Sequence, residues 1–201
     1  MDLPVNLHAS SYFDTMNIEQ ALFLKELGAN RVVMTYQSTI DEIEALCNLK
    51  EVEIEVFGYM GCSFFNGACN MIHDMGEKNT EKGKKIGIPC KGLYHVYSDE
   101  IGDKVVPYLD AELGCALCSI YRLNKMGVDV IKIAGRDRNS KMIKEITSLF
   151  RKAIDFSNTV DEEEYHKLVN ENIYPWWERS WCSSNKCKYR NNRITRSYIG
   201  K

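Results

Sequence analysis

Five cysteines in the middle third of this chain could bind a metal: Cys62, Cys69, Cys90, Cys115 and Cys118. The first three lie in a polar stretch that contains several glycines, where a small buried hydrophobe has little reason to be. Thiolates bind iron–sulfur clusters and zinc strongly, and disulfides do not persist in a reducing compartment. The grouped cysteines therefore predict ligands of a soft metal rather than disulfide bonds.

The positions of these cysteines favour one shared site. Cys62 and Cys69 follow a predicted strand directly, at the end where α/β proteins build their sites. Cys90 lies in a Pro-Cys-Lys turn, and Cys115 and Cys118 would share one face of a predicted helix. Four thiolates could enclose one iron–sulfur cluster, but zinc would use the same set, so the spacing leaves the metal open. Simple packing of the cysteine pair in the helix is the alternative.

Two basic residues could bind an anionic substrate. Lys132 and Arg136 lie at the C-terminal end of a strand predicted over 128–133 and could bind a carboxylate or a phosphate. A salt bridge to a local acid is an equally good interpretation. We interpret His73 and His95 as solvated or structural residues rather than catalytic ones.

Composition and charge exclude a strongly basic nucleic-acid-binding protein. The chain has 201 residues, 44% of them hydrophobic and 27% charged, as in one soluble domain with a core. Its formal net charge is −2 and its pI is about 6.1, so it lacks a global basic field. Residues 186–201 are rich in Lys and Arg and contain no acid, and we interpret them as a solvated tail.

The sequence predicts a cytoplasmic protein. The opening residues, MDLPVNLHAS, lack the basic and apolar blocks of a signal peptide. No window approaches the roughly 18 apolar residues of a membrane span.

Alternating strand and helix patterns must position the cysteines. The predicted strands cover residues 5–9, 31–35, 53–57, 93–97 and 128–133. The predicted helices cover residues 17–27, 39–49, 110–126 and 141–154. This alternation predicts a parallel sheet with helices on its faces, open or barrel-like, with about five units instead of the eight of a closed barrel.

Two segments depart from this alternation. Residues 59–89 form an irregular stretch that needs something to order it. We expect a domain over 1–158 and a distinct piece over 159–201, made of an acidic helix and an aromatic tail packed on the domain. The large apolar area of the tail is supplied by Trp176, Trp177 and Trp181. Cys182 and Cys187 could join Cys118 at a second metal, although packing under the tryptophans is the interpretation we favour.

Several ordered blocks of this sequence resemble the peptidase U32 family, a collagenase-like group. They run through EIEVFGYMGCSFFNGACNM, the turn PCKGLY and CALCSIYRLNKMGVDVIKIAGR followed by FRKAID. The resemblance implies a TIM-like (β/α) barrel domain with a four-iron four-sulfur cluster. The implied cluster ligands are Cys62, Cys69, Cys90 and Cys115, with Cys118 as an alternate.

The family resemblance implies more than one activity. Its name records proteolysis, yet several bacterial members are similar to oxygen-independent hydroxylation proteins that act on ubiquinone, transfer RNA or ribosomal RNA, often with prephenate as oxygen source. This chain contains no serine, cysteine or zinc protease motif. We therefore expect an iron–sulfur protein that takes part in hydroxylation of RNA or a small aromatic molecule. The alternatives are a peptidase and a non-catalytic, degenerate paralogue that pairs with a full-length relative.

This sequence departs from the family pattern in places that matter for function. The family usually begins with about three more βα units. We therefore expect a partial TIM-like barrel that lacks the first βα units, so that the chain either lacks half its barrel or completes it with a partner in a homo- or hetero-oligomer. Tyr36 and Gln37 replace the family's Arg-Glu pair, and Ala134 replaces the Glu of its KIEGR block. Ile86 stands where family members often have another cysteine. Without the Arg-Glu pair and the Glu of the KIEGR block, this chain lacks charged groups that could move protons or bind an anionic substrate.

Overall fold

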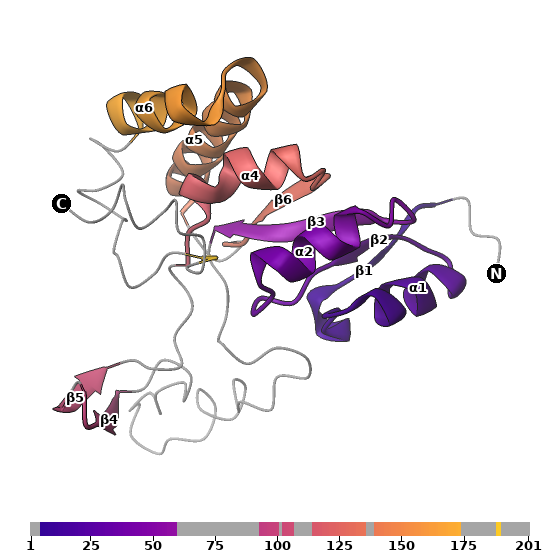
Figure 1. The fold of residues 1–201 in the computed structure, drawn as a ribbon, viewed down its shortest axis with the longest axis horizontal. Coiled ribbons are helices and arrows are strands. Elements are labelled where there is room, and N and C mark those ends of the chain that lie inside the picture. Colours follow the sequence, from indigo (N-terminus) through magenta and orange to yellow (C-terminus); the bar gives the residue numbers. More distant parts are fainter. Residues whose placement is uncertain are drawn as a thin grey trace.

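A four-stranded parallel sheet forms the centre of the molecule (Figure 1). The structure, a computed structural model, describes residues 5–59, 93–100, 102–106, 114–135, 139–173 and 188–189. The strand order is β1-β2-β3-β6, and each neighbouring pair is parallel. These strands are β1 (Leu7–Ala9), β2 (Ala29–Val33), β3 (Glu53–Tyr59) and β6 (Val130–Ile133). The predicted α/β class with a parallel sheet is confirmed.

Four of the five described α-helices begin at a residue whose side chain caps a free backbone N–H, and α4 (Ile120–Lys125) is the exception. Thr39 and Glu42 form the capping box that starts the second helix, and the Asn17 side chain accepts a 2.9 Å bond from the backbone N–H of Gln20 at the first. The described α-helices are α1 (Ile18–Glu26), α2 (Ile40–Cys47), α4 (Ile120–Lys125), α5 (Ser140–Thr159) and α6 (Glu162–Asn172). The described 3-10 helices are η1 (Ser11–Phe13) and η3 (Leu117–Ser119).

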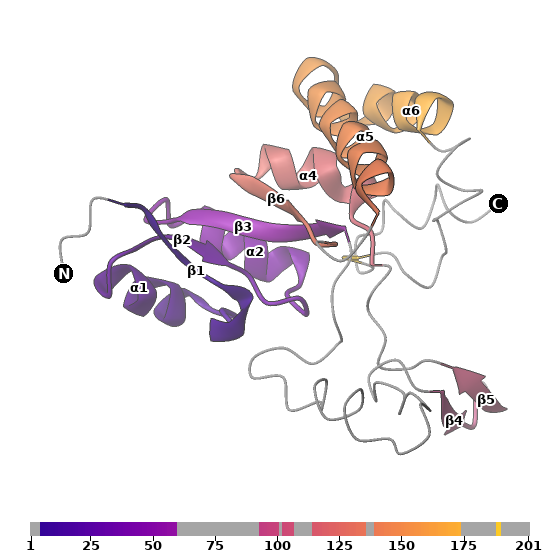
Figure 2. The ribbon, with the colours of Figure 1, turned by 180° about the vertical axis from the view of Figure 1, so that it is seen from behind.

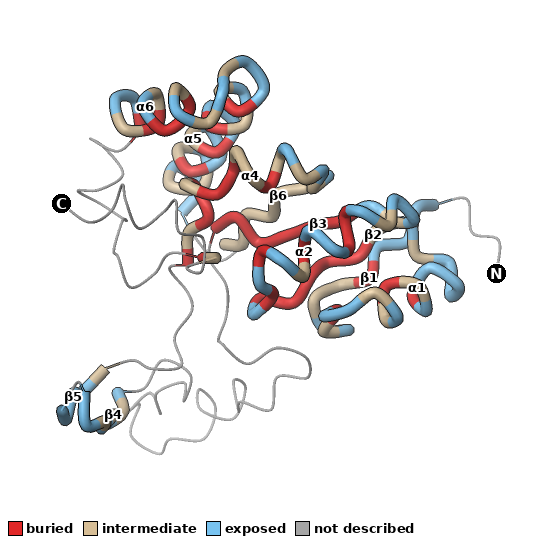
Figure 3. Tube along the Cα trace, in the orientation of Figure 1, coloured by how far each residue is buried: buried red, intermediate tan, exposed pale blue. Residues whose placement is uncertain are grey.

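The main core lies between one face of the sheet and the helices. Alternate strand residues such as Val32, Ile54 and Val56 are fully buried there against helix residues. Figure 1 shows α2 in front of β2 and β3, and Figure 2 shows it behind them. The buried stretch along β2 and β3 is red in Figure 3. None of the described helices is long and apolar enough to cross a membrane.

The opposite face of the sheet carries charged residues and a small apolar cluster. Val33, Tyr36 and Phe57 are buried together, and Ala134 packs against them. The rings of Tyr36 and Phe57 meet edge to face with centroids 5.4 Å apart. Two of the positions at which this sequence departs from the family pattern, Tyr36 and Ala134, therefore belong to one cluster.

The strand predicted over 93–97 does not join the parallel sheet. It is β4 (Tyr94–Ser98), which pairs antiparallel with β5 (Gly102–Val106) in a separate two-stranded sheet. Gly102, at φ +68°, follows the short turn that makes this local pairing possible. We expected about five strand–helix units, but the described parallel sheet has four strands.

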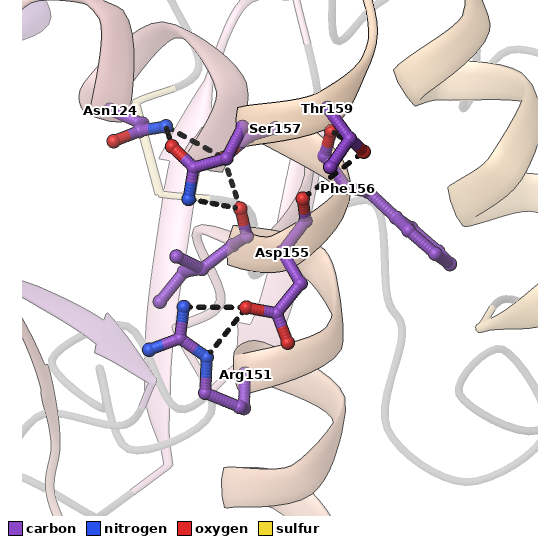
Figure 4. Close-up of polar contacts among 8 residues, drawn as sticks. Asn124, Arg151, Asp155, Phe156, Ser157 and Thr159 are labelled. Atoms are coloured by element: carbon purple, nitrogen blue, oxygen red, sulfur yellow. Dashed lines mark hydrogen bonds and ion pairs between the residues drawn. The ribbon is translucent and has the colours of Figure 1, made fainter.

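Helices α4, α5 and α6 stack beside β6 (Figures 1 and 2). The Asn124 side chain of α4 donates to Ser157 Oγ at 2.9 Å and to Asn158 Oδ1 at 2.8 Å on α5 (Figure 4). Within α5, Arg151 and Asp155 form an ion pair of 2.7 Å. We predicted a boundary between a domain over 1–158 and a separate piece over 159–201. This boundary falls at the last residues of α5, just before α6, and it stays a prediction.

Candidate functional site

The structure describes three of the predicted site residues. Cys115, Cys118 and Lys132 fall in its described parts, while the other predicted residues fall outside them. Those outside are Cys62, Cys69, Cys90 and Arg136, and also His73, Cys182, Cys187 and the three tryptophans of the tail. His95, which we interpreted as solvated or structural, lies on β4 with its Nδ1 3.2 Å from Asp103 Oδ1.

Cys115 lies beside the carboxyl end of β3. It forms an isolated antiparallel bridge with Tyr59, the last residue of that strand. The next backbone N–H, of Ala116, donates to Gly58 O at 2.7 Å. Cys62 follows Tyr59 by three positions in the sequence. The half-buried thiol of Cys115 therefore lies beside the end of β3, the strand that Cys62, the first predicted ligand, follows in the sequence.

Cys115 is not on a helix, so the prediction of a helix over 110–126 is wrong at that position. Among the residues described there, from Gly114 onward, the first helical ones are Leu117–Ser119, and α4 begins at Ile120. Hydrogen bonds to the end of β3 hold Cys115 and Ala116 in a bridge, and these tertiary bonds override local helix propensity.

The turn between the two cysteines is anchored from both sides. The backbone N–H of Leu117 donates to Cys115 Sγ at 3.4 Å, an arrangement that favours a thiolate. The hydroxyl of Tyr165, on α6, donates to Leu117 O at 2.8 Å. Burial raises the pKa of Tyr165 well above its usual value, and the nearby Cys118 and Cys115 act in the same direction.

Two described residues of the tail reach this edge of the sheet. The backbone N–H of Lys188 donates to Cys115 O at 2.7 Å, and the hydroxyl of Tyr189 donates to Phe57 O at 3.1 Å. The Lys188 side chain is buried, with Nζ 3.0 Å from the centroid of the Tyr36 ring. The interpretation of residues 186–201 as a solvated tail is therefore wrong for Lys188 and Tyr189.

Burial sets the ionisation of both tail residues. It lowers the pKa of the Lys188 amino group well below its usual value, while the charge of Cys115 acts to raise it. Burial also raises the pKa of the Tyr189 phenol, which stays neutral at ordinary pH.

Lys132 forms an ion pair with a local acid, Glu55, which was the alternative to binding an anionic substrate. Its Nζ lies 3.1 Å from Glu55 Oε1, and Arg31 Nη1 lies 3.5 Å from Glu55 Oε2. Glu55 is buried on the face of the sheet that also carries Phe57. Arg31 in addition binds Glu53, and that hydrogen bond is the main cause of its raised pKa. The described side chains thus form a ladder of alternating charge across three strands.

The described residues fit a metal–thiolate centre in their chemistry. Cys115 supplies a thiol beside the carboxyl end of β3, with a backbone N–H on its sulfur, and Cys118 supplies a second thiol from the 3-10 helix that follows. The buried residue Lys188 contacts this segment through its backbone N–H, which donates to Cys115 O at 2.7 Å. No cluster of three or more potential ligands occurs within the described ranges, and the other predicted ligands lie outside them.

Sequence reasoning missed Glu55, Tyr165 and Lys188. Glu55 had a signal, because it is an acid inside an otherwise apolar strand run, IEVFGY. Tyr165 lies among the charged residues of a short acidic helix, and Lys188 lies in a basic tail. Neither pattern distinguishes a buried side chain from a solvated one.

The fold and the cysteine-bearing edge define an α/β protein with sequential parallel strands. The family model for peptidase family U32 matches residues 1–194, and the chain belongs to this family. It is 27% identical over 157 residues to 23S rRNA 5-hydroxycytidine C2501 synthase of Escherichia coli, covering 76% of this chain and 24% of that protein. It is also 27% identical over 161 residues to tRNA hydroxylation protein P1 of Bacillus subtilis, covering 75% and 38%.

A third relative extends the same pattern. Identity to tRNA hydroxylation protein P of Escherichia coli is 22% over 201 residues, covering 74% of this chain and 44% of that protein. The chain thus spans less than half the length of these relatives. No solved structure gives a significant match.

Proposed function

We propose that this chain takes part in an oxygen-independent hydroxylation of RNA in the cytoplasm. The observation that carries the proposal is its membership of a family whose relatives here are named for modification of 23S rRNA and tRNA. A small aromatic molecule is the alternative substrate, from the wider resemblance of the family. Because the chain spans less than half of each relative, its activity is inferred for the complex or longer chain in which it works.

The proposed cofactor is a four-iron four-sulfur cluster held by Cys62, Cys69, Cys90 and Cys115, with Cys118 as alternate ligand. Support comes from the position of Cys115 at the carboxyl edge of the sheet, beside the end of β3. Such a cluster supplies electron transfer when bound. Zinc is the alternative metal, because it takes the same thiolates.

Lys132 and Arg136 are proposed to bind an anionic group of the substrate. Lys132 lies near the carboxyl end of β6 with a third of its side chain exposed. Its ion pair with Glu55 holds it in place and leaves donor capacity, since an ammonium has three N–H groups.

The parallel sheet is proposed to be an arc of a (β/α) barrel. Its strands follow one another in sequence order, and its main core lies on the helix side. β1 is an edge strand of the described sheet, and Tyr12 and Phe13, which follow it in the chain, have exposed side chains. A second copy of this chain bound at that edge would cover them. Light scattering of the pure chain tests this, and a monomer across the micromolar range would overturn it.

The cofactor is tested by measuring iron, acid-labile sulfide and zinc in protein purified without oxygen, together with visible and electron paramagnetic resonance spectra. About four irons with matching sulfide are expected per chain. Cys69→Ser should lose the visible absorption, whereas Cys47→Ala should keep it because Cys47 lies in the helix-side core. Full iron content in Cys69→Ser would remove that ligand from the proposal.

The reaction is tested by mass spectrometry of nucleosides from a strain that lacks its own RNA hydroxylation proteins. Expression of this chain, with and without a full-length relative, should restore a hydroxylated nucleoside, and Cys69→Ser should not. Restoration only with the relative would favour the pairing alternative. Cysteine-dependent cleavage of unstructured peptides, with RNA unchanged, would replace the proposal by the peptidase alternative.

A further inference from the structure

The first strand–helix unit leaves a large apolar surface exposed. Of the ten large apolar residues that are exposed in the described part of the chain, seven lie within residues 5–27. Tyr12, Phe13 and Phe23 are 69%, 56% and 57% exposed, and the Gln20 side chain of α1 donates to Phe13 O, so η1 lies beside α1. Because an aromatic side chain has about 150–250 Å² of surface, these three rings expose roughly 300–450 Å². Apolar surfaces of this size mark sites of association.

One face of α1 is exposed, apolar and flanked by acids. Phe23 has Glu19 four residues before it and Glu26 three residues after it, which puts all three on one side of the helix. Leu27, four residues after Phe23, lies on the same side and is 63% exposed. This α1 face is defined by Glu19, Phe23, Glu26 and Leu27, all of them exposed. A partner surface that fits it is apolar and basic.

Helix α5 carries such a surface. Met142, Leu149 and Phe156 are half-buried and recur every seven residues, so they form one stripe along the helix, here called the α5 stripe. The stripe and Asn158, which binds α4, lie on opposite sides of the buried line of α5. Lys152 is exposed beside the stripe, with Nζ 5.6 Å from the centroid of the Phe156 ring. Four of the six charged residues of α5 are basic, whereas two of the three on α1 are acidic.

The two surfaces belong to opposite edges of the sheet. Strands β1 and β6 are the edge strands of the described sheet, with α1 beside β1 and α5 beside β6 (Figures 1 and 2). Four parallel strands in sequence order make one half of an eight-stranded (β/α) barrel. A second copy, related by a two-fold axis along the strands, would pair β1 of each copy with β6 of the other in the parallel sense. Both edges would then close at once, with α1 of each copy next to α5 of the other.

We propose that two copies of this chain close one eight-stranded barrel, in which the α1 face of each copy packs on the α5 stripe of the other. The closure rests on the arc in the proposed function and names the surfaces by which the second copy binds. Two such contacts, each covered from both sides, bury on the order of 1,200 Å², which reaches the range of stable interfaces. Charge favours this arrangement over pairing of two β1 edges, because that pairing would bring Glu19 and Glu26 of the two copies together.

Reversal of charge on each surface tests the pairing. The α1 variant carries Glu19→Lys and Glu26→Lys, and the α5 variant carries Lys141→Glu and Lys152→Glu; all four residues are exposed, and circular dichroism checks folding. Each variant alone sets like charges against each other at both contacts, so its dimer should dissociate at least about tenfold more readily than wild type at low salt. An equimolar mixture of the two variants sets opposite charges against each other at both contacts and should form a dimer again. Light scattering and sedimentation velocity of the full chain are the readouts.

The apolar part of the contact has its own variant and control. Phe23→Ala removes the ring at the centre of the α1 face and should also weaken the dimer at least about tenfold. Tyr97→Ala is the matched control, because Tyr97 is a ring on β4 that is 72% exposed and lies outside both surfaces. Its dimer should dissociate at the same concentration as that of wild type.

The results that would overturn the closure can be told apart. If wild type is a monomer across the micromolar range, pairs only with an added full-length relative, or forms species larger than a dimer, the closed pair fails, whereas RNA hydroxylation by a longer complex stands. If wild type is a dimer but the α5 variant dimerises as tightly, α1 packs on α1 and only the pairing of α1 with α5 fails. A mixture of the two charge variants that stays monomeric would also overturn that pairing.

Discussion

The hydroxyl of Tyr165 donates a 2.8 Å hydrogen bond to the backbone carbonyl of Leu117, which lies between Cys115 and Cys118. Tyr165 is fully buried on α6, and its ring lies 5.5 Å from that of Tyr121 on α4. One side chain of the acidic helix therefore joins α4 and the cysteine turn. A segment that sequence alone separates from the domain over residues 1–158 thus contacts the candidate site.

Removal of this hydroxyl should destabilise the fold. Tyr165→Phe leaves the Leu117 carbonyl without its buried donor, a loss of about 1–3 kcal/mol. Urea unfolding of the metal-free protein measures it. Tyr121→Phe is the matched control, because Tyr121 packs in the same aromatic pair but is only partly buried. Equal stabilities of the two variants would mean that the bond contributes nothing.

Two described cysteines should differ sharply in reactivity. Burial raises the pKa of Cys47 to about 11, with smaller contributions from Asp129 and Glu44, so little thiolate exists at pH 8. Cys118 is only half-buried. Alkylation of native, metal-free protein with iodoacetamide, followed by peptide mass spectrometry, should modify Cys118 at least about tenfold faster. Comparable rates would show that Cys47 is accessible in solution.

The parts of the fold that could be predicted from sequence are those with local causes. The helix at α2 was predictable because Thr39 and Glu42 carry the capping box and Ile43 and Leu46 give helical spacing. Strand β3 was predictable from its apolar run, Ile54 to Phe57, ending near a glycine.

The features that could not be predicted depend on partners far away in the sequence. Cys115 does not adopt the predicted helical conformation, because backbone groups at the end of β3 form hydrogen bonds with its segment. Tyr94 to Ser98 pairs with the strand that follows it, because strand character alone does not specify the partner. Lys188 is buried because its amino group lies over the rings of Tyr36 and Phe57, which are distant in the sequence.

Glu55 should stabilise the sheet face that it shares with Lys132. The side chain is 10% exposed and contacts both Lys132 and Arg31, so Glu55→Gln leaves two cations without their shared anion. Both cations are partly exposed, so water offsets much of the loss, and we expect destabilisation of about 1–2 kcal/mol. Urea unfolding at low salt provides the measurement.

Glu53→Gln is the control for this change. Glu53 also binds Arg31 but is 51% exposed, so its loss should cost less than about 1 kcal/mol. A Glu53 variant as unstable as the Glu55 variant would show that burial of the carboxylate is not what gives the ladder its stability.

His166 should make the fold less stable in mild acid. The residue is buried on α6, and burial lowers its pKa in the folded state although Glu162, 3.8 Å away, acts in the opposite direction. An unfolded histidine has a pKa of about 6.5, so between the folded pKa and that value the unfolded chain binds more protons. The free energy of unfolding therefore rises with pH across this window.

A pH series of urea unfolding between pH 5 and 7.5 measures this contribution. Wild type should lose stability toward pH 5 more steeply than His166→Gln, in which the titrating group is absent while the carboxylates of both proteins titrate alike. The difference in slope, not the absolute stability, is the readout, because glutamine changes the packing at every pH. Parallel curves would show that His166 has the same pKa in the folded and unfolded states and that its burial against Tyr165 does not resist protonation.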